Sequence, residues 1–305
     1  MNGASAYADW IAVDWGTSRL RVWAMAWGGQ VVARAASDDG MGVLDRDGFE
    51  PALLRLIAPW LGQGAMPVLA CGMVGARQGW AEMPYQPVPC APGNLRPGPV
   101  ATQDKRLRLF IMPGLSQAQP ADIMRGEETQ IAGFMARQPG FDGVLCLPGT
   151  HTKWVRISAG EVTSFQTFMT GEVFRLLSKG SVLRHSVAIA EVDQKGFLSM
   201  LSQTLSRPER LAQGLFSIRA QGVLNGMAPA RARGQLSGVL IGAELAAAKP
   251  YWLGQRVVII GAAALSVLYA GGLDSQGVTA ERYDADPLTR AGLARACASV
   301  MERTP

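Results

Sequence analysis

One stretch decides the fold: Trp10-Ile-Ala-Val-Asp-Trp-Gly-Thr-Ser-Arg-Leu-Arg-Val-Trp23. Residues 10–13 form an apolar run that leads into a turn at Gly16, and a strand pattern resumes at Leu20. Two such runs separated by a turn residue are typical of a β-hairpin. We therefore predict two antiparallel strands joined by a tight turn.

Three polar side chains, Asp14, Thr17 and Ser18, would lie at the tip of this hairpin. Gly16 would let the backbone approach a ligand closely, and the two hydroxyl groups are donors suited to phosphate oxygens. A carboxylate repels bare phosphate, so Asp14 indicates a hydrated Mg²⁺, which keeps several waters and touches few carboxylates directly. The alternative is an ordinary tight hairpin with an Asp/Gly/Thr turn.

Length and composition predict two domains around a cleft. The chain has 305 residues and is 48% apolar, whereas single cores stop growing at roughly 250–300 residues. The net charge of +5 comes from scattered basic residues without a long run, so no nucleic-acid footprint is visible. A mildly basic cleft for a small anionic ligand fits this charge better.

The four cysteines lack CxxC spacing, and only two histidines could join them, which argues against a zinc site or a disulfide framework. No signal peptide and no uninterrupted membrane-spanning run is visible. We expect a cytoplasmic protein without a membrane partner. The sequence leaves open whether the chain forms a homodimer.

Further elements continue the opening hairpin. A turn at Gly28-Gly-Gln30 and a strand at Val31–Ala36 would complete a meander of three antiparallel strands. Residues 49–61 repeat apolar side chains at helical spacing, and residues 67–72 form a buried strand. The predicted order of elements in this part of the chain is therefore βββαβ.

A loop rich in glycine and proline follows, and it carries Arg77, Trp80 and Tyr85. Loops of this length with such side chains are often binding loops. Beyond it, residues 122–134 are predicted to be a helix in which Glu127 and Glu128 complement the helix dipole.

The pattern of the opening recurs in the second half. A strand at 141–147 runs into a Gly-Thr turn, and a strand at 161–168 follows. The donors here are Gly149, Thr150, His151, Thr152 and Lys153. We interpret the recurrence as a distant duplication of a phosphate-binding hairpin, in which Lys153 either neutralises phosphate charge or is a solvated strand residue.

The remaining chain is predicted to be mainly helical. Thr170 is a candidate N-cap for the first of these helices. Small residues at 238, 242 and 246 recur every four positions, which indicates tight contact with a second helix or with a flat ligand. The other expected elements are helices at 196–205, 209–227, 236–248 and 287–301, a buried strand from 256, and a short strand at 278–280.

The strand from residue 256 enters a small-residue turn at Gly261 and Ala262, where a nucleotide base or ribose can lie against the backbone. Together, Asp14–Thr17, Pro148–His151 and Ile259–Ala263 resemble the two phosphate motifs and the adenosine motif of the actin-like ATPase superfamily. The adenosine motif departs from the glycine-rich form of that superfamily at Ala262–Ala264.

The likeness is closer to the 2-dehydro-3-deoxygalactonokinase family. The strings that carry it are Ala12–Arg21, Gly72–Gly75, Gly79-Trp80, Pro84-Tyr85, Met124–Gln130, Pro148–Val155, Met169–Glu172 and Leu236–Glu244. The most distinctive are Met-Arg-Gly-Glu-Glu-Thr-Gln and Pro-Gly-Thr-His-Thr-Lys-Trp-Val.

This resemblance implies an α/β, two-lobed, ribonuclease H-like fold, each lobe being a mixed sheet flanked by helices. Residues 1–136 with the helix at 287–303 would form a lobe with the first phosphate hairpin and the sugar-acid loop. Residues 137–286 would form a lobe with the second hairpin and the adenosine site.

The resemblance also implies an activity: ATP-dependent and Mg²⁺-dependent phosphorylation of the 6-hydroxyl of 2-dehydro-3-deoxy-D-galactonate. Superfamily sugar kinases carry an Asp followed by a small or hydroxyl residue and then an apolar helix at this place, and Glu128-Thr129 matches that pattern better than Glu127, so Glu128 is the expected base. Glu127 would then support the base or face the metal. The alternatives are a phosphohydrolase of the same superfamily and a nucleotide-dependent regulatory module.

The substrate is a carboxylate, so a cation should meet it, and Arg77 and Arg125 are the two candidates. Either one could instead form a surface ion pair, which contributes little to stability. Gly75, Trp80 and Tyr85 complete the expected substrate-binding set.

Overall fold

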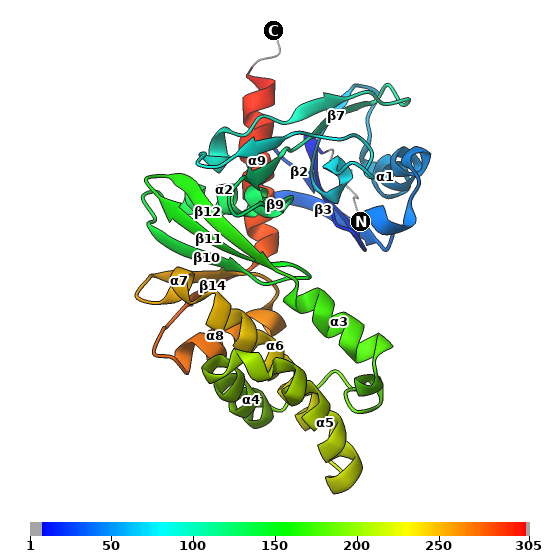
Figure 1. Ribbon diagram of the computed structural model, residues 1–305. Helices are drawn as coiled ribbons and strands as arrows, with labels where there is room; N and C mark the ends of the chain where they lie inside the picture. Colours follow the sequence, from blue (N-terminus) through cyan, green and yellow to red (C-terminus); the bar gives the residue numbers. More distant parts are fainter. Residues whose placement is uncertain (1–7, 303–305) are drawn as a thin grey trace, which may run out of the picture. The chain divides into compact units, whose positions relative to one another are not determined.

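The computed structural model describes residues 8–302 (Figure 1). The chain divides into two compact units. The first unit comprises Met1–Phe141, Ser158–Thr163 and Ala285–Pro305, and the second comprises Asp142–Ile157 and Ser164–Asp284.

The first unit contains a six-stranded mixed sheet. In spatial order its strands are β3 (Val31–Ser37), β2 (Leu20–Met25), β1 (Trp10–Trp15), β4 (Met66–Gly72), β7 (Leu107–Ile111) and β6 (Gly98–Val100). The predicted three-stranded antiparallel meander is confirmed, and β4 pairs parallel to β1. The loop between β1 and β2 is four residues long, because Trp15 pairs with Leu20.

The core of this unit lies between the sheet and helix α1 (Phe49–Ile57). Every residue of β4 is buried, in agreement with the apolar run that predicted it. Trp15 and Phe49 are completely buried, and their rings lie 5.1 Å apart.

Helices α2 (Glu127–Arg137) and α9 (Ala285–Met301) lie side by side in the same unit (Figure 1). A Cβ added to Gly292 would lie 2.0 Å from the carbonyl oxygen of Thr129, so the two backbones touch. This contact fixes the first turn of α2, which carries the glutamate pair.

A small sheet of β5 (Tyr85–Pro87), β8 (Gly114–Gln117) and β9 (Asp122–Met124) precedes α2. The prediction that the helix extends from residue 122 is wrong, because residues 122–124 form β9 and α2 begins at Glu127. Gly126 has a φ of 108°, a conformation that only glycine adopts readily, and it separates strand from helix.

The second unit contains a five-stranded sheet. In spatial order its strands are β12 (Glu161–Phe168), β11 (Thr152–Ser158), β10 (Gly143–Leu147), β13 (Val257–Ile260) and β14 (Glu281–Tyr283). The final strand was predicted at 278–280 and lies at 281–283 instead. The amide of Val278 bonds the carbonyl of Leu273 and thereby closes the preceding helix, and Val278 and Ala280 pack against the core outside the sheet.

The helices of this unit are α3 (Thr170–Gly180), α4 (Gln194–Ser206), α5 (Leu211–Asn225), α6 (Pro229–Ala247), α7 (Lys249–Trp252) and α8 (Ala263–Asp274). The tight contact predicted from the small residues is confirmed, because a Cβ added to Gly238 would lie 2.3 Å from the carbonyl oxygen of Phe197 on α4. No helix within residues 8–302 is both long and apolar enough to cross a membrane.

Candidate functional site

Asp14 lies within β1 rather than at the tip of the hairpin, so the predicted position is corrected. The cause is the β1–β2 register, which places Asp14 directly opposite Arg21. The guanidinium of Arg21 pairs with the carboxylates of both Asp14 and Asp286. Burial raises the pKa of Asp14, and the charge and hydrogen bond of Arg21 oppose that rise.

The tip comprises Gly16, which is partly buried, and the exposed residues 17–19. The amide of Gly16 donates to the carbonyl of Arg19 and closes the turn. The amide of Gly42 donates to the carbonyl of Thr17 at 2.8 Å, so the segment that follows β3 holds the tip in place. This support was not predicted, because it joins residues distant in the sequence.

Glu128 is completely buried at the start of α2. Its two carboxylate oxygens accept hydrogen bonds from the amide of Gly126 at 2.6 Å and the hydroxyl of Thr129 at 2.9 Å. Burial, followed by the charge of Glu127, raises the pKa of Glu128 to about 7. The environment therefore holds a carboxylate in a fixed orientation with a pKa near neutrality.

Glu127 is partly exposed, in contrast to its neighbour. Its charge contributes to the raised pKa values of both Asp14 and Glu128. The three carboxyl groups therefore form one electrostatic cluster in the first unit.

Arg125 is buried, with 8% of its surface exposed. Its guanidinium lies 4.2 Å from the centre of the Tyr85 ring, and Nη2 donates to the carbonyl of Met83 at 2.7 Å. The buried Nη1 has no hydrogen-bond partner within residues 8–302. A Cβ added to Gly75 would lie 2.9 Å from Nη1, so the structure brings Gly75, Tyr85 and Arg125 together around an unpaired donor.

The other two residues predicted in the substrate loop lie elsewhere. The side chain of Arg77 is exposed, and its Nε lies 3.6 Å from a carboxylate oxygen of Glu82. The ring of Trp80 stacks on Phe49 with a centroid distance of 6.3 Å and also contacts Trp15. Trp80 thus belongs to the core of the first unit.

The second Gly-Thr turn lies between β10 and β11. Thr150 and His151 are exposed, and Nε2 of His151 lies 2.6 Å from a carboxylate oxygen of Glu172. Lys153 is buried, so it is not a solvated strand residue, and its Nζ donates to the carbonyl of His151 at 3.3 Å.

Helix α3 is joined closely to this turn. The amide of Glu172 donates to the carbonyl of Thr150, and a Cβ added to Gly171 would lie 2.2 Å from the carbonyl oxygen of Gly149. The N-cap of α3 is Met169 rather than the predicted Thr170. The side chain of Thr170 instead hydrogen-bonds Glu244, a buried carboxyl group on α6.

Glu244 joins four elements of the second unit. Its carboxylate accepts hydrogen bonds from the indole of Trp154 at 2.8 Å and the hydroxyl of Tyr269 at 2.7 Å, in addition to the bond with Thr170. The hydroxyl of Tyr269 also lies 2.9 Å from that of Thr152, at the end of the Gly-Thr turn. Burial raises the pKa of Glu244 to about 7.

Because the folded state holds the Glu244 proton more tightly than the usual pKa of 4.5 allows, stability should fall as pH rises from about 4.5 through 7. We expect this loss to be smaller in Glu244→Gln, which cannot ionise. Thermal unfolding midpoints of both proteins across this pH range test the expectation. Parallel curves would show that Glu244 does not titrate there.

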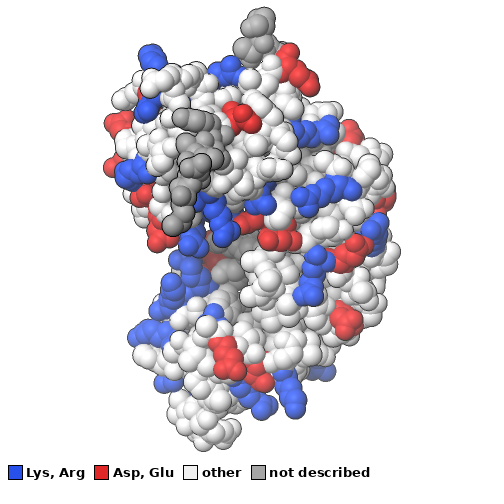
Figure 2. All heavy atoms as spheres, turned by 180° about the vertical axis from the view of Figure 1, so that it is seen from behind, with Lys and Arg blue, Asp and Glu red and all other residues white. Residues whose placement is uncertain are grey.

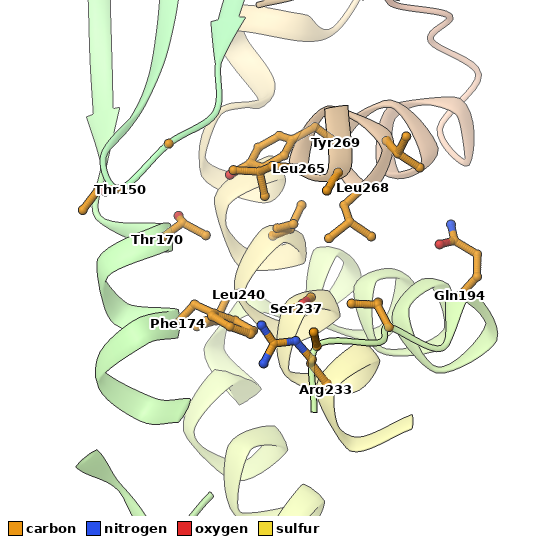
Figure 3. Close-up of a pocket in the computed structure, with 17 residues that line it drawn as sticks. Thr150, Thr170, Phe174, Gln194, Arg233, Ser237, Leu240, Leu265, Leu268 and Tyr269 are labelled. Atoms are coloured by element: carbon orange, nitrogen blue, oxygen red, sulfur yellow. The ribbon is translucent and has the colours of Figure 1, made fainter. Parts of the chain in front are cut away.

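A cavity of about 620 Å³ lies beside this network, among α3, α6 and α8 (Figure 3). Leu265 and Leu268 on α8 face Phe174 and Leu240, and Thr150 of the Gly-Thr turn lies at one end. The walls are mainly apolar, which suits a flat aromatic ring. Gly261 and Ala262, the predicted adenosine residues, lie immediately before α8 and do not line the cavity.

Arg233 is the principal cation of this cavity, and it was not predicted. Its guanidinium lies 4.9 Å from the centre of the Phe174 ring, and its buried Nε has no partner in the described part of the chain. Both residues lie on helices, where side chains that line a cavity have the same periodicity as side chains that pack a core.

The residues that could hold a cation are fewer than in a dedicated metal centre. Within residues 8–302 no group of three or more His, Cys, Asp or Glu side chains could enclose a metal ion. Of the two carboxylate oxygens of Asp14, only Oδ2 pairs with Arg21 in the described residues 8–302. This donor set fits Mg²⁺, which binds through one or two carboxylates and completes its shell with water and phosphate.

Charge is unevenly distributed over the surface. In Figure 2 a group of Lys and Arg side chains gathers along the left edge of the visible face, and basic and acidic side chains are mixed elsewhere. The basic side chains that give the chain its net charge of +5 are therefore concentrated in one part of this face.

Comparison with known proteins gives consistent results. The family model described as 2-keto-3-deoxy-galactonokinase matches residues 14–296. A probable 2-dehydro-3-deoxygalactonokinase of Rhizobium meliloti is 39% identical over 98% of this chain and 99% of its own length. A 2-dehydro-3-deoxygalactonokinase of Escherichia coli is 31% identical over 94% of this chain and 96% of its own.

Solved structures extend the comparison to the fold. A Sinorhizobium meliloti protein, described in its structure as a candidate 2-dehydro-3-deoxygalactonokinase, superimposes with a TM-score of 0.87 and 39% identity, covering 95% of this chain and 99% of that one. The activator of 2-hydroxyisocaproyl-CoA dehydratase from Clostridium difficile, solved with bound ADPNP, superimposes with a TM-score of 0.51 and 11% identity. That superposition covers 97% of this chain and 98% of the activator. The predicted α/β fold class is confirmed.

Proposed function

The chain belongs to the 2-keto-3-deoxy-galactonokinase family, and from this premise we propose that it transfers the γ-phosphoryl group of ATP to the 6-hydroxyl of 2-dehydro-3-deoxy-D-galactonate. Members of this family are sugar-acid kinases, so the enzyme is a phosphotransferase. The reaction would be a cytoplasmic step of galactonate catabolism. The observation that carries the proposal is the buried, unpaired Nη1 of Arg125.

A buried donor without a partner costs free energy, and an anionic acceptor would recover it. The substrate carries one carboxylate, and guanidinium groups bind carboxylates through two parallel hydrogen bonds. Arg125 would therefore hold the carboxylate, with Tyr85 fixing the guanidinium plane and Gly75 leaving room at Nη1. Arg77 is less suited, because its side chain is exposed and its Nε already lies 3.6 Å from a carboxylate oxygen of Glu82.

The acceptor hydroxyl must be oriented and relieved of its proton during transfer. Glu128 would be the base, since its pKa of about 7 lets it accept a proton near neutral pH. The bonds from Gly126 and Thr129 hold its oxygens in place before substrate arrives. Glu127, which is more exposed, is the alternative base.

The nucleotide would occupy the second unit. We assign the purine ring of ATP to the 620 Å³ cavity between Phe174 and Leu268. Its phosphates would lie at the Gly-Thr turn formed by Gly149 and Thr150. The hydroxyls and amides of the first hairpin tip are also donors suited to phosphate oxygens. Lys153 would offset the negative charge that develops on transfer.

Asp14 is the residue that would hold Mg²⁺, through its second carboxylate oxygen and bound water. When bound, the ion neutralises phosphate charge and favours attack by the hydroxyl. Arg21 orients the Asp14 carboxylate, and its charge and hydrogen bond oppose the rise in the pKa of Asp14 that burial causes.

A screen of ATP consumption tests the proposed function. Purified enzyme should consume ATP with 2-dehydro-3-deoxy-D-galactonate and produce the 6-phosphate, with slower turnover of aldonates and of the gluco-configured acid. ATP hydrolysis of equal rate without any sugar acid would instead indicate a phosphohydrolase. Tight ATP binding without turnover of any acid would indicate a regulatory module.

Arg125→Lys should raise the KM for the sugar acid by roughly 10- to 100-fold, because hydrogen bonds to charged groups contribute about 1.5–3 kcal/mol and lysine cannot form the bidentate pair. The KM for ATP should change little. Arg77→Lys is the matched control, since that side chain is exposed and should leave both values near wild type. A larger rise of the sugar-acid KM in Arg77→Lys than in Arg125→Lys would show that Arg77, rather than Arg125, binds the substrate carboxylate.

A further inference from the structure

A second hollow in the second unit shares no lining residue with the nucleotide cavity. It has a volume of about 640 Å³ and lies among α4, α5, α6 and the short 3-10 helix Pro208–Arg210. We call it the α4–α6 groove. Of its fourteen described lining residues only Met200 and Gly214 are non-polar, so its walls are unlike a gap between packed helices.

Three arginines, Arg207, Arg210 and Arg231, line the α4–α6 groove. The described residues that line it include no aspartate or glutamate, and none of the three guanidinium groups forms an ion pair within residues 8–302. Glu209 stands between two of them in the sequence and is exposed, as the three arginines are, but it does not line the groove. Three positive charges without a counter-charge on the walls favour an anion, and guanidinium groups match phosphate geometry.

Gln235 on α6 gives a second, independent indication of a ligand. The residue is 5% exposed and lines the groove, and its side-chain oxygen Oε1 has no hydrogen-bond partner in the described part of the chain. A donor from a bound molecule would satisfy this buried acceptor. A sugar hydroxyl is such a donor, whereas a bare anion is not.

The walls carry further groups suited to hydroxyls. Gln203 donates to Ser199 along α4 at 3.3 Å, and Gln221 donates to Ser217 along α5 at 3.2 Å. Each pair still presents acceptor and donor capacity to the groove. The ligand should therefore combine an anionic group with several hydroxyls.

We propose that the α4–α6 groove is a binding site for a phosphorylated sugar acid, with the phosphate on the arginines and a hydroxyl on Gln235. The groove and the nucleotide cavity share helix α6. Arg231 and Gln235 line the groove, whereas Arg233 and Ser237 line the cavity, and residues two positions apart lie on nearly opposite faces of a helix. Occupancy of the groove therefore shifts nucleotide affinity through α6, and this link rests on the proposed function, while binding itself does not.

Calorimetric titration with 6-phosphogluconate tests the site in the Arg125→Ala enzyme, in which the proposed substrate site is disabled. We expect binding that weakens by roughly tenfold or more in an added Arg207→Gln/Arg210→Gln pair. Arg219→Gln, on α5 and outside the groove, is the matched control and should bind normally. Unchanged binding in the arginine pair would overturn the site.

Two further measurements identify the ligand class and the link. Gln235→Leu should weaken the binding of 6-phosphogluconate but not the binding of inorganic phosphate. If the unsubstituted groove binds inorganic phosphate as tightly as 6-phosphogluconate, the groove holds an adventitious anion only. Thermal unfolding midpoints confirm that each variant is folded. In the enzyme with Arg125 intact, 6-phosphogluconate should change the dissociation constant of ADP. The Arg207→Gln/Arg210→Gln pair should abolish that change. An ADP affinity that does not respond to 6-phosphogluconate would refute the coupling between the groove and the nucleotide cavity.

Discussion

Glu128→Gln is expected to lower kcat by about 10²–10⁴-fold, the usual contribution of general-base assistance, with little change in ATP affinity. The substitution preserves shape and removes the proton acceptor. The amide oxygen can keep the hydrogen bond from the Gly126 amide, and the new NH2 group can donate to the Thr129 hydroxyl in place of the second bond, so the fold should be retained. Single-turnover rates with saturating ATP and sugar acid measure the effect.

Glu127→Gln is the matched control, one residue away and on the same helix turn. On an α-helix adjacent side chains diverge by about 100°, so only one of the two can point squarely at the substrate. We expect a smaller loss for Glu127→Gln. The reverse ranking would assign the base to Glu127, the more exposed of the pair.

The pH profile adds an independent signature. Because a base must be deprotonated and the pKa of Glu128 is about 7, kcat/KM should rise with pH and level off above neutrality. Glu128→Gln should lose this acidic limb. An acidic limb that survives in the variant would belong to another group, and Asp14 would be the next to test.

Asp14→Asn has the second large expected effect, the loss of most of kcat at limiting Mg²⁺. The amide keeps the size of the side chain but removes the charge that a cation requires. Rates measured across a Mg²⁺ titration should show a weaker apparent affinity for the metal. Wild-type rates at limiting Mg²⁺ would remove Asp14 from the metal site.

The variant Asp286→Asn distinguishes the loss of a metal ligand from the loss of the ion pair with Arg21. Asp286 and Asp14 share Arg21, so either change disturbs that guanidinium, but only Asp14 lies on the strand that leads into the phosphate turn. We expect Asp286→Asn to keep its Mg²⁺ dependence. Equal losses in both variants would show that the Arg21 pairing, rather than a metal, accounts for the effect.

The elements of this protein could be predicted from the sequence wherever a local pattern determines them. The β-meander, the buried strand β4 and most of the helices follow from apolar periodicity, and the small residues of α6 indicated a close neighbour, which the structure shows to be α4. Two of the errors, at residues 122–124 and 278–280, lie where a glycine turn or a helix end changes the chain direction.

The sequence by itself thus determined the β-meander, the buried strands, most of the helices, the two Gly-Thr turns and the family, because each depends on residues close together in the chain or on a contiguous string. Only the tertiary structure decided the environment of each polar group. Arg21 pairs with Asp286, 265 positions away, Trp80 enters the core, and Arg125 keeps a buried donor unpaired. The physical reason is that periodicity reports the average burial of a segment, whereas the pKa and the pairing of a buried group depend on the particular atoms that distant segments bring to it.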